Sequence, residues 1–162
     1  MHHTRRPFRK GTIIVPAPDV HTLKFFDMIQ KVTAVMNGEG RFRPADGRQI
    51  ADLNPKELLL FAAADCAGRT ITALMKDRKS AIKSFEIAIE GTLSTPTLMA
   101  ESRYTTINIL YNIECRTLKE QIEISRAVNL AHDKYCGLVQ MLRMIAPVQR
   151  EISIVATDQV TA

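Results

Sequence analysis

One stretch decides the fold: Asn54-Pro55-Lys56-Glu57-Leu58-Leu59-Leu60-Phe61-Ala62-Ala63-Ala64-Asp65-Cys66. Asn54 is a favoured N-cap, and Glu57, three residues later, completes a capping box with it. The apolar run that follows predicts a helix from Pro55 to about Lys76, buried on most sides. At about 1.5 Å per residue this helix spans roughly 33 Å, the width of a small domain. Cys66 lies about three turns into it, so the sequence places a thiol deep inside a central helix.

The segments around this helix predict an α+β domain. Turn signals at 37–40 and 46–47 separate short strands, alternating hydrophobicity marks longer ones, and a second capping box opens another helix. Because strands and helices follow in separate runs, we expect helices packed on an antiparallel sheet. The expected elements are strands at 31–36, 41–43 and near 48–50, the central helix, strands at 85–90 and 104–115, a connection at 91–99, helices from 118 to about 135 and at 138–145, and a strand at 148–156.

Residues 1–30 are expected to be a basic N-terminal arm, and residues 31–162 one domain. The first ten residues carry a charge of +4 out of the net +5, and the remaining chain has 18 basic and 17 acidic residues. The domain itself therefore lacks the basic, aromatic-bearing surface expected for nucleic-acid binding. Within the arm, 11–15 suits a short strand and 20–30 has roughly helical spacing.

Composition excludes several other classes of protein. No apolar run approaches the roughly 18 residues of a membrane-spanning helix, and no long apolar segment follows the basic start as in a secretory signal. Three cysteines form neither a disulfide framework nor a C-x-x-C zinc site, which favours a reducing compartment, the cytoplasm. We expect no metal and no cofactor, because the four histidines form no cluster of metal ligands. They are His2, His3, His21 and His132.

The chemistry of the chain depends on Cys66 and Cys136, each associated with a major helix. A thiol attacks as a thiolate, and burial raises its pKa, so a reactive Cys66 needs a cation. Cys136 is expected at a helix C-terminus, with Gly137 as a helix break, and there the helix dipole disfavours an anion. On that ground Cys66 is the better attacking thiol and Cys136 the resolving one. Four arginines are candidate cations: Arg41, Arg43, Arg48 and Arg69.

Each of these residues also has a structural explanation. A cysteine on a buried helix is usually a packing residue, and Glu57 is accounted for by capping alone. Cys115 is in phase with the buried side chains of its strand and reads as a small core hydrophobe. His132 lies four residues before Cys136 and can act as its proton partner, although a surface position is expected. Tyr135 is expected on the buried helix face.

Three blocks resemble the OsmC/Ohr family of thiol-dependent peroxidases. The first is 31–50, similar to the opening strands of the family with their glycine turn. The second is 54–66, similar to the family's N/S-P-x-E-L-L…A-A-x-x-C helix. The third is 127–136, similar to the helix that ends at the family's second cysteine. The likeness covers about residues 31–156.

This resemblance implies an intertwined homodimer with two long central helices and active sites at the subunit interface. It implies that Cys66 attacks an organic hydroperoxide, that Cys136 resolves the product as a disulfide, and that a dithiol reductant restores both thiols, without a metal or organic cofactor. By the same likeness Arg41 and Glu57 are candidate catalytic residues. Neither nucleic acid nor membrane is an expected partner.

Two departures from the Ohr branch leave other functions open. Lys56 stands where that branch has an acid, and Glu39 stands where it has an arginine, with Arg41 the nearest substitute. The chain thus resembles the broader OsmC-like branch. One rival function is a non-catalytic protein that binds a small apolar molecule. Another is a redox-sensing or partner-docking protein that uses the basic arm.

Overall fold

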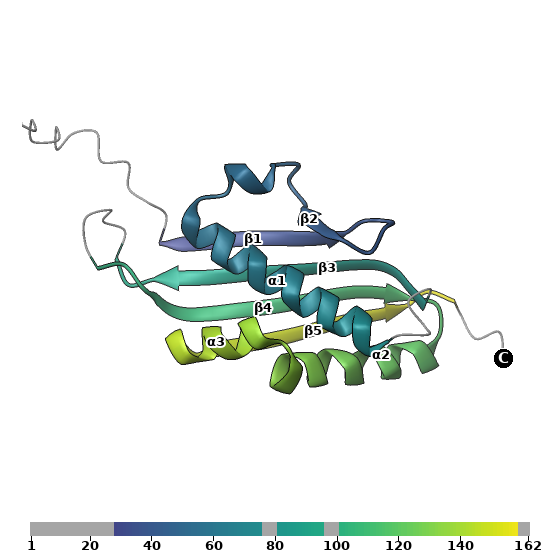
Figure 1. Ribbon diagram of the computed structural model, residues 1–162. Coiled ribbons are helices and arrows are strands. Elements are labelled where there is room, and N and C mark those ends of the chain that lie inside the picture. The colour runs from purple at the N-terminus through teal and green to yellow at the C-terminus, as the bar shows by residue number, and fades with distance from the viewer. Residues whose placement is uncertain (1–27, 76–80, 96–100, 159–162) are drawn as a thin grey trace, which may run out of the picture.

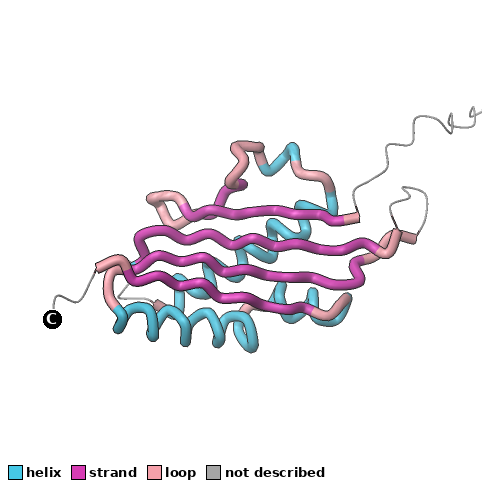
Figure 2. The backbone as a smooth tube through the Cα atoms, turned by 180° about the vertical axis from the view of Figure 1, so that it is seen from behind, coloured by secondary structure: helices cyan, strands magenta, loops and turns pink. Residues whose placement is uncertain are grey.

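The computed structural model describes residues 28–75, 81–95 and 101–158. A single five-stranded sheet carries all the helices on one face, as the opposite views in Figures 1 and 2 show. The strand order is β2-β1-β3-β4-β5. The elements are β1 (Ile29–Met36), β2 (Phe42–Pro44), η2 (Ile50–Asp52), α1 (Pro55–Leu74), β3 (Ile82–Leu93), β4 (Tyr104–Cys115), α2 (Leu118–Leu130), η4 (Ala131–Tyr135), α3 (Gly137–Ile145) and β5 (Val148–Ala156).

The α+β class is confirmed, but the sheet is mixed and not wholly antiparallel. Strands β1 to β4 pair antiparallel, whereas β5 runs parallel to β4 over Val148–Ala156. The reason lies in the connection, because α2, η4 and α3 carry the chain back along the sheet before β5 begins (Figure 1). A parallel pair needs such a long crossover, while a short turn gives an antiparallel one.

Three local predictions are wrong. Residues 48–50 form no third strand: η2 stands there, because Asp46 accepts a hydrogen bond from the Arg48 amide (3.0 Å) and Gln49 and Asp52 form a capping box. Residues 91–93 belong to β3 and not to the connection. Met28 lies in a bend and Ile29 and Gln30 lie in β1, not in a helix. Residues 20–27 of that predicted helix, the strand at 11–15 and residues 96–99 lie outside the described residues.

The capped helix begins as predicted. Asn54 Oδ1 accepts from the amides of Lys56 (2.9 Å) and Glu57 (3.0 Å), and Glu57 Oε2 accepts from the Asn54 amide (3.0 Å). α1 then crosses the sheet diagonally over β1, β3 and β4 (Figure 1). It packs on the sheet and against α2, η4 and α3 but leaves Leu58, Leu59 and Leu74 exposed, so burial on most sides is not observed in the single chain. Its buried residues are Leu60, Phe61, Ala63, Ala64, Ala67, Gly68, Ile71 and Thr72.

The core lies between the sheet and the helices. Alternate residues of β3 and β4 point into it, as the period of two in these strands requires. Phe42 of β2 stacks edge to face on Phe85 of β3, with ring centroids 5.2 Å apart, beneath α1. The largest fully buried side chains are Tyr111, Phe85, Leu60, Ile71, Ile87, Ile89, Leu93, Ile107, Ile109, Ile113, Ile124 and Leu142.

The close approach of α1 to β2 gives a stability prediction. A Cβ atom at Gly68 would lie 2.2 Å from the Phe42 ring, whereas one at Gly137 would meet no atom within 4 Å. We expect Gly68→Ala to lower the free energy of unfolding by about 1–3 kcal/mol, because overpacking displaces the ring. Gly137→Ala, the matched control, should be neutral or slightly stabilising. Urea denaturation measures both, and equal midpoints for the two variants would contradict this packing.

Candidate functional site

Cys66 lies in the middle of α1, on the side that turns away from the sheet. Cys66 is half-buried, whereas Ala63 and Ala67 on the same helix are buried and Arg69 is exposed. The Thr70 hydroxyl donates to the Cys66 carbonyl (2.8 Å), within a regular helix. The sulfur therefore stands at the edge of the core and reaches toward the neighbouring helical elements η4 and α3, which pack on α1.

Cys136 is presented by a wide turn between two helices. After α2 the chain forms one π turn, η4, in which the Cys136 amide donates to the Ala131 carbonyl (2.8 Å), five residues back. Gly137 is not a break, because α3 begins there with Cys136 as its N-cap. The thiol thus faces the positive end of α3 as well as the end of η4. The expectation that the dipole at Cys136 only disfavours an anion is therefore wrong.

The structure brings the two thiols together across 70 positions of sequence. The Cys136 thiol donates to Cys66 Sγ, with the sulfur atoms 3.3 Å apart. Cys136 is fully buried, and both residues are free thiols. At this distance the two sulfur atoms are within hydrogen-bond reach. A disulfide bond is about 2.05 Å long, so a short movement of the sulfur atoms would form one.

Burial makes the Cys136 thiol hard to ionise. It raises the pKa of Cys136 to about 11, and the neighbouring Cys66 sulfur adds to that rise. The amides of Val139 and Leu138, at the start of α3, oppose the shift without cancelling it. Cys136 therefore keeps its proton near neutral pH and offers it to Cys66, which is the acceptor in the pair.

The predicted cations lie elsewhere in the single chain. Arg41 is exposed in the turn before β2, and among the described residues its guanidinium makes no ion pair or hydrogen bond. Arg69 is paired with Asp65 (3.1 Å). In the described ranges no cation hydrogen-bonds the sulfur of Cys66.

Glu57 pairs with Arg48 and not with Arg41. The Arg48 guanidinium donates to both carboxylate oxygens of Glu57 at 3.1 Å, and to Asp46 at 2.7 Å, so η2 is tied to the start of α1. Glu57 also caps the helix, as predicted. It lies nine residues before Cys66, which is about 14 Å along the axis of α1.

Lys56, which stands where the Ohr branch has an acid, is held at the same end of α1. Its ammonium donates to Ser102 Oγ (2.8 Å), and the Tyr104 hydroxyl donates to its carbonyl (2.9 Å).

His132 and Tyr135 exchange their predicted environments. His132 is 2% exposed, with Nδ1 3.1 Å from the buried Tyr111 hydroxyl, whereas Tyr135 is 51% exposed. The extra residue of the π turn rotates the chain after Ala131, so the 3.6-residue spacing no longer predicts which side chains are buried. The sequence contained one signal for the burial of His132. Tyr111 was predicted to point into the core, and a buried tyrosine hydroxyl needs a hydrogen-bond partner.

Cys115 is buried as predicted, at the ends of β4 and β5. Its thiol is directed at the carbonyls of Thr117 (3.6 Å) and Val155 (3.5 Å), and burial raises its pKa. It is packed as a small core side chain.

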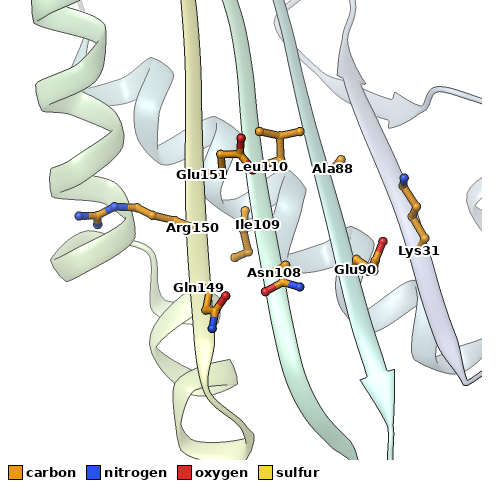
Figure 3. A pocket seen from close by; sticks show the side chains of 9 residues that line it. All are labelled: Lys31, Ala88, Glu90, Asn108, Ile109, Leu110, Gln149, Arg150 and Glu151. Atoms are coloured by element: carbon orange, nitrogen blue, oxygen red, sulfur yellow. The ribbon is translucent and has the colours of Figure 1, made fainter.

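The face of the sheet away from the helices carries a hollow of about 370 Å³ over β1, β3, β4 and β5 (Figure 3). Charged and amide side chains line it, among them Lys31, Glu90, Asn108 and Glu151. Neither Cys66 nor Cys136 lines it, so it is separate from the thiol pair.

The described residues thus form an α+β domain that brings two free thiols into contact. A family model described as OsmC-like protein matches residues 46–151, and the chain belongs to that family. Membership, together with the thiol contact, indicates a redox function related to peroxides.

The chain is similar to several distant relatives. Protein YhfA of Escherichia coli strain K12 is 26% identical over 105 residues, which are 64% of this chain and 74% of the relative. A hypothetical protein from Aquifex aeolicus VF5 superposes with a TM-score of 0.55 at 21% identity, covering 80% of this chain and 98% of that one. An OsmC like protein from Mycoplasma pneumoniae gives 0.52 at 19% identity, covering 82% and 98%. These two structures show a shared fold. No helix in the described parts of the chain is long and apolar enough to cross a membrane.

The buried histidine predicts a pH dependence of stability. Burial, and secondarily the charges of Arg143 and Arg150, lower the pKa of His132 from 6.5 to about 4. In this pH range the unfolded chain therefore binds a proton at His132 and the folded chain does not. The free energy of unfolding falls as pH drops from about 6.5 toward 4. Between about pH 7.5 and pH 5 we expect the wild type to lose roughly 2 kcal/mol more than His132→Gln. Chemical denaturation at both pH values measures the difference, and equal losses would show that His132 is not held neutral.

Proposed function

We propose that this protein is a thiol-dependent reductase of organic hydroperoxides, with Cys66 as the attacking thiol and Cys136 as the resolving thiol. The observation that carries the proposal is the 3.3 Å contact between the two sulfur atoms. Family membership supports the substrate class. The three free cysteines, two of them in contact, suit a reducing compartment such as the cytoplasm.

In the first step the Cys66 thiolate attacks the outer oxygen of the hydroperoxide. The O–O bond breaks, the alkoxide leaves and takes up a proton as the alcohol, and Cys66 becomes a sulfenic acid. The Cys136 S–H already donates to the Cys66 sulfur before the attack.

In the second step Cys136 attacks the oxidised Cys66 sulfur. The S–O bond breaks, hydroxide leaves with the proton of Cys136 as water, and the Cys66–Cys136 disulfide forms. A dithiol reductant then exchanges twice with this disulfide, becoming a disulfide itself and restoring both thiols. The high pKa of Cys136 suits this role, because a protonated thiol does not compete for the peroxide.

A homodimer is part of the proposal. The helices expose several large apolar side chains, and a second copy of the chain, which the family resemblance implies, is our candidate for covering them. Exposed Arg41, with no partner among the described residues, is our candidate for the cation that meets Cys66 of the other copy, and Glu57 would fix that end of α1 through Arg48. The exposed side chains are Leu58, Leu59, Leu74, Leu130, Tyr135, Met141, Met144 and Ile145.

One observation favours a second candidate function, a redox sensor. In the described part of the chain the Cys66 sulfur has Cys136 as its hydrogen-bond partner but no cation, and Lys56 is held by Ser102 at the other end of the helix. A thiol pair without an activating cation forms a disulfide slowly and signals oxidation without turnover. The rate of the peroxide reaction separates the two functions.

Cysteine variants test the peroxidase proposal. We expect Cys66→Ser to lose at least about a hundredfold in the rate of hydroperoxide consumption with a dithiol reductant, because the attacking sulfur is gone. Cys136→Ser should react once with peroxide and then fail to turn over with the dithiol. Cys115→Ala, which leaves both site thiols in place, is the matched control and should remain active. Full activity in Cys66→Ser would overturn the proposal.

The dimer is tested by charge on the apolar helical face. Met144 is 88% exposed on α3. The chain mass is 18.2 kDa, and we expect the wild type to sediment as two chains. Met144→Lys should shift it toward the single chain, because a buried unpaired ammonium is costly. Glu151→Lys, on the opposite face of the sheet, should sediment like the wild type. A wild type that sediments as a single chain would contradict the dimer.

A further inference from the structure

The π turn η4 is anchored through its first half and carries Cys136 at its end. The turn closes with the Cys136 amide on the Ala131 carbonyl, and its first half is tied to the rest of the domain through His132 and Asp133. Single π turns inside helices are uncommon and frequently occur at functional sites. Here the turn ends at one of the two thiols in contact.

The anchor inside the core is the contact between Tyr111 and His132. Tyr111 points inward from β4, is fully buried, and shares a hydrogen bond of 3.1 Å with Nδ1 of His132. The two rings meet edge to face, with centroids 5.9 Å apart and planes at 84°. A buried polar contact of this kind fixes an orientation, because losing one partner leaves the other buried and unsatisfied.

The outer anchors hold the same half of the turn. Gln140 of α3 donates its side-chain amide to the His132 carbonyl (2.8 Å). Asp133 accepts from Arg143 of α3 (3.2 Å) and from Arg150 of β5 (2.6 Å). The turn is thus fastened to β4, α3 and β5, and the Cys136 side chain at its far end is directed at Cys66.

Forming the disulfide requires a defined movement of the two sulfur atoms toward each other. The sulfur atoms lie 3.3 Å apart. They must close to a bond length of about 2.05 Å, so the required displacement is slightly more than an ångström. We infer that Tyr111 and His132 form a positioning pair for the resolving thiol, anchoring η4 so that Cys136 lies at attacking distance from the oxidised Cys66. This inference rests on the proposed function, since it concerns the second step of that reaction. Neither residue touches the reacting atoms, so both act through the turn.

The inference is tested with 4,4′-dithiodipyridine, which oxidises the pair without a peroxide. Cys66 attacks one sulfur of the probe, forming a mixed disulfide and releasing one thiopyridone. Cys136 then attacks the Cys66 sulfur, the Cys66–probe bond breaks, and a second thiopyridone leaves as the protein disulfide forms. Stopped-flow absorbance follows the two releases as separate phases.

We expect Tyr111→Phe, which removes only the hydroxyl, to slow the second phase at least about tenfold, because a misplacement of an ångström is costly, and to leave the first within about twofold. His132→Gln should act in the same way if Tyr111→Phe is too unstable to purify. Tyr104→Phe is the matched control, because it removes a hydroxyl from the same strand, one that donates to the Lys56 carbonyl and not to η4, and it should match the wild type in both phases. Thermal melts of each variant establish that it is folded at the temperature of the assay.

A second phase in folded Tyr111→Phe or His132→Gln as fast as in the wild type would overturn the inference. So would an equal slowing of both phases, since general loosening affects attack and resolution alike. Failure of the proposed function is distinguishable, because a wild type that does not consume hydroperoxide still shows both phases with the probe. The split between the phases therefore reports on positioning alone.

Discussion

The hydrogen bond between the thiols of Cys136 and Cys66 is the contact on which the functional reading of this fold depends. It exists because α1 crosses the sheet diagonally and because a π turn delivers Cys136 to the start of α3, beside α1. Burial keeps the proton on Cys136, so the pair is asymmetric before any reaction begins. In this pair the Cys136 thiol is the hydrogen-bond donor and the Cys66 sulfur is the acceptor.

Much of the architecture could be predicted from local signals. The capping boxes at Asn54 and Thr117 mark two helix starts, and the alternation in β4 marks its inward residues, because caps and periodicity are properties of neighbouring residues. The parallel placement of β5 could not be read in this way, since it depends on how the intervening helices return along the sheet. The strand predicted near 48–50 failed because side-chain contacts of Asp46 and Asp52 favoured a turn over a three-residue strand.

The candidate site was predictable in part. The two cysteines were identified from their helices and from the family resemblance, but the spacing alone gave no contact. The environment of Cys136 was misjudged because a π turn has no clear signature in the sequence, and that turn exchanged the positions of His132 and Tyr135. Arg48, a candidate cation for Cys66, pairs with Glu57 because the turn at Asp46 directs its side chain to the start of α1. Prediction from sequence failed where one inserted residue or one side-chain contact changed the phase of an element.

The central claim is that peroxide converts the thiols of Cys66 and Cys136 into a disulfide. Stoichiometric oxidation tests it most directly, because the loss of thiols measures how much disulfide forms. The reduced protein is treated with one equivalent of an organic hydroperoxide, the remaining thiols are counted, and the linked peptides are mapped by mass spectrometry. We predict the loss of two thiols per chain, recovery of a peptide joining Cys66 to Cys136, and an intact Cys115 thiol. Retention of all three thiols, or a disulfide that includes Cys115, would contradict the proposed role of the pair.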